Sequence, residues 1–392
     1  MKPLEGITVV ALEQAIAAPF ATRQLADLGA RVIKIERPGE GDFARHYDRS
    51  VRGMASHFVW TNRSKESLTL DLKHPEANVV LKRLLAQADV FVHNLAPGAV
   101  DRLGFAATTL RETLPRLIIC NISGYGSCGP YREKKAYDLL IQAESGLLSV
   151  TGTEQTPVKV GISAADIAAG MYTFSGILTA LFMRERTGEG TTIEVSLLEA
   201  LAEWMGYPAY YTAYSGESPK RVGAHHASIA PYGPLTLGDG SALLIGIQNE
   251  REWGRFCEQV LKQPELAQEP RFYSNTERVA HRTELEALLD EPFQRMTLDQ
   301  AIEGLESAHI AYGQMRSMQE FLDHPQLKAR GRWREVDSPV GMLQALLPPT
   351  SLEGVEPVFG PIPALGQHTD AILQEIGLNE EEIARMRDQH II

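Results

Sequence analysis

The 392-residue sequence has only three cysteines, Cys120, Cys128 and Cys257, and their spacing forms neither a disulfide framework nor a zinc-binding pattern. This scarcity is typical of a protein that works in a reducing compartment, so we expect a cytoplasmic location. Basic residues are also in deficit, because 38 lysines and arginines against 50 acidic residues give a net charge of −12. We expect no nucleic-acid partner, since nucleic-acid binding depends on many cationic contacts to phosphates.

The start of the chain, MKPLEGITVVALEQ, lacks the cationic residues and the long apolar run of a secretory signal peptide. Residues 162–183 form a longer apolar run, nearly long enough to span a membrane. Asp166 lies within this run, and an ionised carboxyl group is rare and costly inside a bilayer. We therefore expect a buried core helix there and no membrane as a partner.

Two phosphate-binding fingerprints, G-x-G-x-x-G and G-x-x-x-x-G-K-[ST], are absent after the first apolar run, where the sequence reads EQAIAAPFA. A nicotinamide-dependent dehydrogenase is therefore not favoured. Strand and helix patterns nevertheless alternate, which predicts an α/β fold with a mostly parallel, Rossmann-like sheet. The expected strands are 7–12, 31–36, 67–72, 90–95, 116–125 and 191–198, and the expected helices are 18–30, 74–88, 137–149 and 164–184.

A second, smaller unit is indicated by the Gly/Pro/Ser-rich segment 215–233, which is typical of a connection between domains. The patterns beyond it predict a strand at 241–247, helices at 249–261, 282–296 and 298–307, and an amphipathic helix from His368 to about Gln389. We therefore place a large domain at 1–214, a linker with a small domain at 215–324, and a last segment at 325–392.

Signatures of metal sites and serine hydrolases are missing as well. The sequence contains no H-E-x-x-H, no other cluster with metal-ligand spacing and no G-x-S-x-G. We expect neither a metal site nor α/β-hydrolase chemistry.

The basic residues that are present gather in segment 31–65, which holds eight cationic side chains against four acidic ones. Arg37 directly follows a predicted strand, and ligands of open α/β sheets bind at the carboxyl ends of strands. The segment is either a solvated basic rim or a site for a ligand that carries several phosphates. Its cations are Arg31, Lys34, Arg37, Arg45, Arg49, Arg52, Arg63 and Lys65.

Asp166 opens an otherwise apolar predicted helix. As a structural residue it would cap the helix or complement the helix dipole. As a functional residue it would be a nucleophile, because a helix N-terminus favours the ionised carboxylate and that group can attack an activated carbonyl. His225 and His226 leave a similar choice between surface histidines and ligand contacts.

Seven blocks are spread along the chain: LADLGARVIKIERPGEGD (25–42), NRSKESLTLDLK (62–73), VHNLAPGAVDRLGF (92–105), PRLIICNISGYGSCGPY (115–131), SAADIAAGMYTFSGILTAL (163–181), RTGEGTTIEVSLLEA (186–200) and LGQHTDAILQEIGL (365–378). In this order they resemble the family III CoA-transferases, the family that also includes carnitine-CoA transferase, formyl-CoA transferase and α-methylacyl-CoA racemase.

The resemblance implies a nucleophilic aspartate at Asp166 and coenzyme A as a substrate, with no permanently bound cofactor. It also implies a large domain built from both ends of the chain, a smaller domain in the middle, and a homodimer of interlocked chains. The coenzyme-binding residues that it implies are Arg37, Leu72, Lys73, Asn94, Leu95, Arg102, Lys135 and Tyr137.

One departure separates the two chemistries of the family. Racemase-like members carry a histidine base in a G-H-D step, and here that position is Tyr137, a poor base at neutral pH. We therefore expect acyl-CoA:carboxylate CoA transfer, with a racemase or isomerase and a non-catalytic CoA-binding protein as the alternatives.

A second departure concerns the acceptor acid. The glycine run of some formyl- and oxalate-specific members is absent, and the corresponding segment 221–233 is similar to that of members that use succinyl-CoA with C4–C6 dicarboxylates. Mesaconate, itaconate and citramalate are examples. We expect His226, Ser228 and Tyr232 to contact the acceptor.

Overall fold

The computed structural model describes residues 2–392, and the chain divides into two compact units. The first unit combines Met1–Leu147, Val160–Tyr207 and Leu327–Ile392, and the second combines Leu148–Lys159 and Pro208–Gln326. Segment 148–159 was expected in the large domain. It belongs to the second unit because the Arg221 guanidinium donates to the Thr153 carbonyl at 2.8 Å and the Gly223 N–H donates to the Gly152 carbonyl at 2.8 Å.

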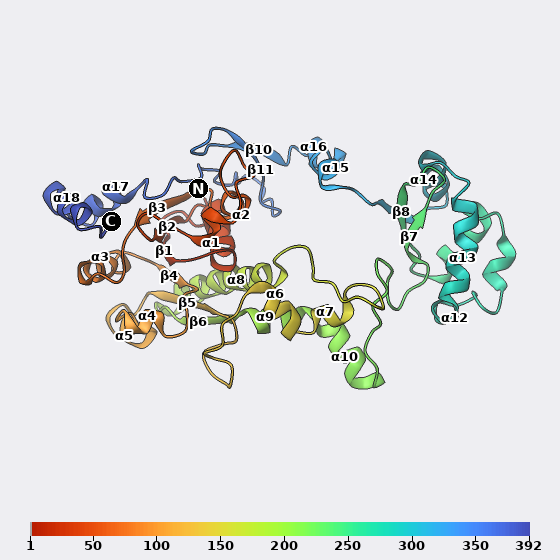
Figure 1. The fold of residues 1–392 in the computed structure, drawn as a ribbon, viewed down its shortest axis with the longest axis horizontal. Coiled ribbons are helices and arrows are strands. Elements are labelled where there is room, and N and C mark those ends of the chain that lie inside the picture. The colour runs from red at the N-terminus through yellow and green to blue at the C-terminus, as the bar shows by residue number, and fades with distance from the viewer. Residues whose placement is uncertain (1) are drawn as a thin grey trace. The chain divides into compact units, whose positions relative to one another are not determined.

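A six-stranded parallel sheet forms the centre of the first unit, in the order β3-β2-β1-β4-β5-β6 (Figure 1). An α/β fold with a parallel sheet was predicted and is confirmed. The strands are β1 (Thr8–Leu12), β2 (Arg31–Glu36), β3 (Lys65–Thr69), β4 (Val90–His93), β5 (Ile118–Ser123) and β6 (Thr192–Ser196).

The central strands of this sheet are buried on both faces, because their successive side chains enter two different cores. In β1, Val9 and Ala11 belong to one hydrophobic cluster, whereas Val10 and Leu12 belong to the other. The strands therefore read as near-continuous apolar runs.

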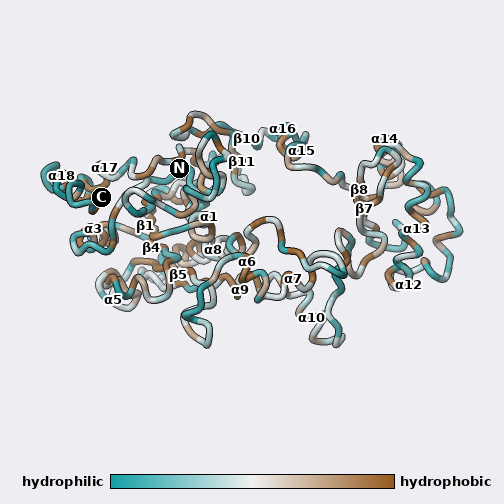
Figure 2. Tube along the Cα trace, viewed as in Figure 1, coloured by the Kyte–Doolittle hydropathy of each residue, from teal (hydrophilic) through white to brown (hydrophobic). Residues whose placement is uncertain are grey.

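The outer helix α18 (Glu380–Asp388) is by contrast mainly hydrophilic (Figure 2).

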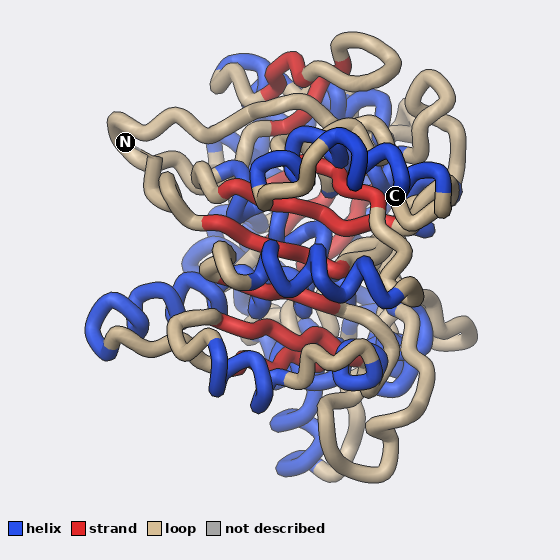
Figure 3. The backbone as a smooth tube through the Cα atoms, turned by 90° about the vertical axis from the view of Figure 1, so that its left-hand side faces the viewer, coloured by secondary structure: helices blue, strands red, loops and turns tan. Residues whose placement is uncertain are grey.

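Helices cover the two faces of the sheet (Figure 1). One face packs against α1 (Ala17–Asp27), α8 (Ala164–Thr187) and α9 (Leu197–Trp204). Figure 3 looks onto the other face, where helices cross in front of the strands. The helices of that face are α3 (Pro75–Leu85), α4 (Ala99–Arg102), α5 (Ala107–Thr113), α17 (Thr369–Glu375) and α18.

The amphipathic helix expected from His368 to Gln389 is two helices, and that prediction was wrong. Gly377 has a left-handed φ of +89° and interrupts the run after α17. Asn379 then caps α18 in a capping box with Glu382. The apolar spacing of the two helices is continuous enough to mimic one.

Helix α8 is 24 residues long, and among the described residues it is the one helix long and apolar enough to cross a membrane by length and composition alone. Its inner side packs small residues such as Ala165 and Ala169 against α1 and α9. Met171 and Phe182 on its outer side are exposed, so the expectation of a buried core helix was wrong for that side.

The remaining elements of the first unit are short. They are the 3₁₀ turn η1 (Phe43–His46), α2 (Ser56–Thr61), α6 (Asp138–Glu144) and the hairpin of β10 (Trp333–Val336) and β11 (Leu343–Leu346). Three helices contain residues of both units, because the chain passes from one unit to the other within them. They are α7 (Leu147–Val150), α10 (Gly206–Ser215) and α16 (Pro325–Ala329).

The second unit has a three-stranded antiparallel sheet in the order β7-β8-β9, covered by helices. Its core includes the fully buried Trp253, Phe256 and Phe293. The elements are β7 (Tyr232–Thr236), β8 (Ala242–Gly246), α11 (Glu250–Arg255), the π-helical turn η2 (Phe256–Val260), η3 (Pro264–Gln268), α12 (Asn275–Ala280), α13 (Arg282–Phe293), α14 (Leu298–Ser307), β9 (Ala311–Gln314) and α15 (Met318–Leu322).

Candidate functional site

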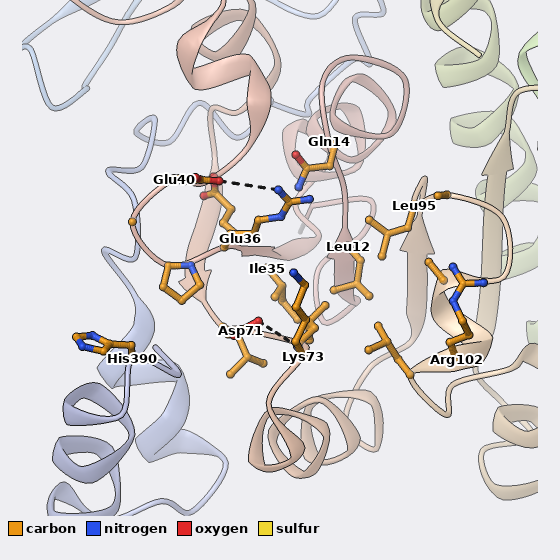
Figure 4. A pocket seen from close by; sticks show the side chains of 18 residues that line it. Leu12, Gln14, Ile35, Glu36, Glu40, Asp71, Lys73, Leu95, Arg102 and His390 are labelled. Atoms are coloured by element: carbon orange, nitrogen blue, oxygen red, sulfur yellow. Dashed lines mark hydrogen bonds and ion pairs between the residues drawn. The ribbon is translucent and has the colours of Figure 1, made fainter. Parts of the chain in front are cut away.

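A cavity of about 810 Å³ opens at the carboxyl ends of β1, β2, β3 and β4 (Figure 4). Such an edge is where open parallel sheets bind ligands. Apolar side chains line much of the cavity, whereas four cationic or titratable nitrogen groups, Arg37, Lys73, Arg102 and His390, reach it from different segments. An apolar cavity with basic groups around it suits a flat ring system that carries phosphate groups. The apolar lining residues are Leu12, Ile35, Leu70, Leu72, Leu95, Ala96, Ala99 and Leu103.

Five of the eight residues implied for coenzyme binding line this cavity: Arg37, Leu72, Lys73, Leu95 and Arg102. The Arg37 side chain is 56% exposed, and its nearest carboxylate is Glu40 at 3.9 Å. Arg37 is therefore available to an added anion.

Asn94 lies beside the cavity and not in its lining. Its side-chain oxygen accepts from the Gln14 N–H at 2.9 Å, and its amide nitrogen donates to the Gln14 carbonyl at 2.8 Å. These two bonds hold the backbone of Gln14, whose side chain does line the cavity. Asn94 is therefore placed to position Gln14.

Lys135 and Tyr137 are also outside the cavity lining. Both are exposed in the stretch that leads into α6, and Tyr137 is 72% exposed at the N-cap of that helix. The structure thus does not gather all the expected coenzyme contacts at one cavity.

Two lysines of the basic segment 31–65 are buried in ion pairs and are not free to bind a phosphate ligand. Lys34 and Lys65 are fully buried, where Lys34 contacts Asp42 at 2.6 Å and Lys65 contacts Glu13 at 2.6 Å. Burial would lower the pKa of Lys34, but Asp42 and Glu13 raise it above its usual value. Burial lowers the pKa of Lys65 to about 8.

Arg31, Arg45 and Arg63 are paired with carboxylates as well. These five cations therefore neutralise acids of the fold, and the expectation that the segment binds a ligand with several phosphates was wrong for them. A charge count along the sequence cannot separate buried ion pairs from free cations.

Asp166 lies in the first turn of α8 and is partly buried. The N-cap of the helix is Ser163, so Asp166 is not the cap. Burial, together with the negative charge of Asp138, raises the pKa of Asp166 to about 7. This differs from the expectation that the helix N-terminus keeps the carboxylate ionised, because the loss of water and the second acid both favour the protonated form.

Asp138, in the first turn of α6, supplies the cap that α8 lacks. One of its carboxylate oxygens accepts from the Ala165 N–H at 2.8 Å and from the Asp166 N–H at 3.4 Å. The other accepts from the Gln142 amide at 2.7 Å. Asp138 therefore fixes the helix turn that carries Asp166 and also raises the pKa of Asp166.

Tyr47, after η1, lies within electrostatic reach of Asp166. Partial burial and the charges of Asp42 and Asp166 raise the pKa of the Tyr47 hydroxyl, and Tyr137 contributes in the same direction. The Tyr47 ring packs edge-on against His57 at 5.6 Å between ring centroids. A phenol, a second phenol and a carboxylate therefore occupy one neighbourhood, where hydroxyls can donate to an oxyanion.

The three expected acceptor residues, His226, Ser228 and Tyr232, belong to the second unit. His226 and Tyr232 stack with ring centroids 5.2 Å apart, and the Ser228 N–H donates to Nδ1 of His226 at 3.2 Å. The three residues thus form one cluster within their own unit.

Sequence reasoning missed Gln14, Tyr47, Asp138 and His390. Asp138 directly follows Tyr137 in the step that was compared with the racemase motif, but its contact to α8 spans 28 residues and has no local signal. His390 reaches the cavity only through the fold of the segment after α18. Among the described residues, no group of three or more histidine, cysteine, aspartate or glutamate residues could hold a metal ion.

Comparison with known proteins gives matches over nearly the whole chain. A family model described as CoA-transferase family III matches residues 4–369. The chain is 33% identical to human succinyl-CoA:glutarate CoA-transferase over 400 residues, which cover 100% of this chain and 91% of the relative. It is 30% identical to succinyl-CoA–D-citramalate CoA-transferase of Chloroflexus aurantiacus, covering 100% of this chain and 98% of that one.

A solved structure of a CAIB/BAIF family protein from Brucella suis has the same fold. It superposes with a TM-score of 0.84 at 35% sequence identity, covering 96% of this chain and 99% of that one.

Proposed function

The chain belongs to CoA-transferase family III, and from this we propose that it moves coenzyme A from succinyl-CoA to a C4–C6 dicarboxylic acid, such as mesaconate, itaconate, citramalate or glutarate. Relatives named for glutarate and D-citramalate as acceptors support this substrate class. The observation that carries the proposal is the partly buried Asp166 in the same unit as the basic-rimmed cavity.

The proposed reaction proceeds through Asp166 in four substitutions at acyl carbons. The Asp166 carboxylate attacks the donor thioester, forming a mixed anhydride and releasing the coenzyme A thiolate. That thiolate attacks the aspartyl carbonyl, which leaves an aspartyl-CoA thioester and frees the donor acid. The acceptor carboxylate attacks this thioester and again releases the thiolate, which then attacks the acceptor acyl carbon and restores Asp166. Every intermediate keeps an activated acyl group, so no external energy source is needed.

Residues of the first unit have distinct proposed roles in this reaction. Arg37, Lys73 and Arg102 bind the coenzyme phosphates at the cavity, and its apolar side chains pack against the adenine. Tyr47 and Tyr137 donate to the oxyanion that develops at the attacked carbonyl. Lys135 is proposed to contact the coenzyme beyond the cavity.

The acceptor contacts are proposed for His226, Ser228 and Tyr232 of the second unit. A dicarboxylate keeps one carboxylate free while the other reacts, and histidine, serine and tyrosine can each donate a hydrogen bond to it. A monocarboxylate of the same length lacks that group and gains nothing from these donors.

A homodimer is also proposed, as the family resemblance implies. Exposed apolar side chains along α8, including Met171 and Phe182, support a second copy of the chain as the partner of this surface. Light scattering of the wild type and of Phe182→Glu tests this, because an acid at a buried interface should yield monomers. A wild-type protein that is monomeric at micromolar concentration would contradict it.

The test of the function is a panel of free acids incubated with succinyl-CoA, with new CoA esters detected by mass spectrometry. C4–C6 dicarboxylates should form esters, and monocarboxylates of matched length should form far less. Asp166→Asn should form none while still binding coenzyme A. Turnover with monocarboxylates alone would overturn the acceptor class, and near-normal turnover of the variant would overturn the role of Asp166.

A further inference from the structure

The segment after α18 turns back onto the loop that follows β3. His390 adopts a left-handed backbone with φ +57°, and the next N–H, of Ile391, donates to the Met386 carbonyl at 2.9 Å. The Ile391 side chain is buried in the core beneath the sheet, and its carbonyl accepts from the Asp71 N–H at 2.7 Å. These contacts fix the position of His390 relative to the loop 71–73.

This arrangement places His390 in the lining of the 810 Å³ cavity together with Lys73. The imidazole has no hydrogen bond or ion pair to another residue of the described chain 2–392, and it is exposed. Asp71 and Glu40 also line the cavity, so a phosphate there needs several donors to offset these carboxylates. An unengaged imidazole that lines the same cavity as a lysine is such a donor, since at least one ring N–H is present in either charge state.

The two ends of the cavity differ in what they lead to. Gln14 accepts from the Phe43 N–H at 3.2 Å, and η1, which begins at Phe43, leads to Tyr47 near Asp166. Figure 4 shows Gln14 and His390 well apart on the rim, with Lys73 nearer the centre. The thioester of a bound coenzyme must extend toward Asp166, so the His390 side receives the other extremity of the molecule, the ribose with its 3′-phosphate.

We propose that His390 donates a hydrogen bond to the 3′-phosphate of coenzyme A and makes the site discriminate coenzyme A from 3′-dephospho-CoA. The proposal rests on the proposed function, because it requires the coenzyme to occupy this cavity. It adds a specificity-determining residue from a part of the chain more than 280 residues from every other residue of the lining.

The test measures dissociation constants of coenzyme A and 3′-dephospho-CoA by calorimetry for the wild type and three variants. His390→Asn removes the ring and retains a residue that tolerates the left-handed backbone. His390→Lys keeps a donor, and Gln389→Ala is the matched control on the same segment outside the cavity lining.

His390→Asn should weaken coenzyme A binding about tenfold and leave 3′-dephospho-CoA binding unchanged. His390→Lys and Gln389→Ala should keep the wild-type preference. Equal weakening for both ligands, or none for either, would overturn the role of His390 at the 3′-phosphate. A wild type that binds neither ligand would instead overturn the proposed function, so the two failures are distinguishable.

Discussion

The carboxylate of Asp138 accepts the backbone N–H of Asp166 at 3.4 Å, so one acid holds the turn that carries another. The hydrogen bond fixes the position of Asp166, whereas the charge of Asp138 favours its protonated form. Positioning and ionisation are therefore in opposition at this site. With a pKa of about 7, a large share of Asp166 is protonated and unable to attack at neutral pH.

Replacing Asp138 with asparagine should separate these two effects. The amide oxygen can still accept from the Ala165 and Asp166 N–H groups, but the negative charge is gone. The pKa of Asp166 should then fall, so the acid limb of the pH profile of kcat/KM moves from about pH 7 to lower pH. Initial rates between pH 5 and 9 measure the shift.

Gln142→Ala is the control for this experiment, because Gln142 donates to the same carboxylate but carries no charge. The acid limb of the Gln142→Ala profile should stay near the wild-type position, because the negative charge of Asp138 is retained. It should not move to as low a pH as the acid limb of Asp138→Asn. An unchanged limb in Asp138→Asn would show that Asp138 does not set the ionisation of Asp166.

Replacing Asp166 itself with asparagine should stabilise the protein at alkaline pH. The folded-state pKa of about 7 lies above the usual 3.8, so the folded protein holds a proton that the unfolded chain releases between these values. The wild type therefore loses stability as pH rises from 4 to 7, and the variant does not. We expect the variant to be more stable by about 1–2 kcal/mol at pH 8 after allowance for partial solvent access, and equal at pH 4. Urea unfolding at both pH values measures this, and equal stability at pH 8 would contradict it.

Arg37→Ala and Arg102→Ala should each raise KM for the acyl-CoA more than KM for the acceptor acid. Loss of one charge-assisted contact to a phosphate costs about 1.5–3 kcal/mol, which corresponds to roughly a 10- to 150-fold effect. Arg295→Ala, an exposed arginine of the second unit, is the control and should leave both constants unchanged. Equal increases for the two substrates would indicate a folding defect and not a lost phosphate contact.

Asp42→Ala should destabilise the fold strongly. Asp42 and Lys34 form a fully buried ion pair, and Asp42 also accepts from the Ala15 N–H at 2.8 Å. Removing one member of a buried pair leaves an uncompensated charge and costs about 3–5 kcal/mol. Asp370→Ala breaks an exposed pair with Arg387 and should cost less than about 1 kcal/mol. Chemical denaturation of both variants compares the two, and similar losses would refute the distinction.

Tyr137 should mark transferase chemistry. The wild type in deuterated water should leave the configuration of (R)- or (S)-2-methylacyl-CoA unchanged, because inversion by 1,1-proton transfer needs a base on each face of Cα. Tyr137→His adds a base next to Asp138 and should introduce slow deuterium uptake at Cα without faster transfer. NMR of the recovered ester measures uptake. Rapid exchange in the wild type would favour the racemase alternative.

Much of the sheet could be predicted from the sequence, because its central strands, buried on both faces, are near-continuous apolar runs. The range 31–36 agrees with β2, and 164–184 agrees with most of α8. The strand expected at 67–72 begins earlier, as β3 at Lys65–Thr69. The apolar pattern does not include Lys65, because a lysine is polar and its burial depends on the ion pair with Glu13, which is distant in the sequence.

The site was less predictable than the fold, because its key contacts join distant segments. Asp166 was expected as the nucleophile from the family resemblance, but its raised pKa depends on burial and on Asp138. Asn94 was expected as a coenzyme contact, whereas its hydrogen bonds hold Gln14. Local patterns identify residue types and spacing, and they carry no information on which partner each side chain meets.

The joining of β3 to the segment around α17 has a consequence for synthesis on the ribosome. The Ser67 N–H donates to the His368 ring at 3.1 Å, and these residues are 301 positions apart. At about 5–20 residues per second, roughly 15–60 s separate the emergence of the two partners. During that interval β3 is the edge strand of a nascent sheet, and its outer neighbour in the finished fold does not yet exist. The outer edge of β3 is therefore open to pairing with another strand during that interval.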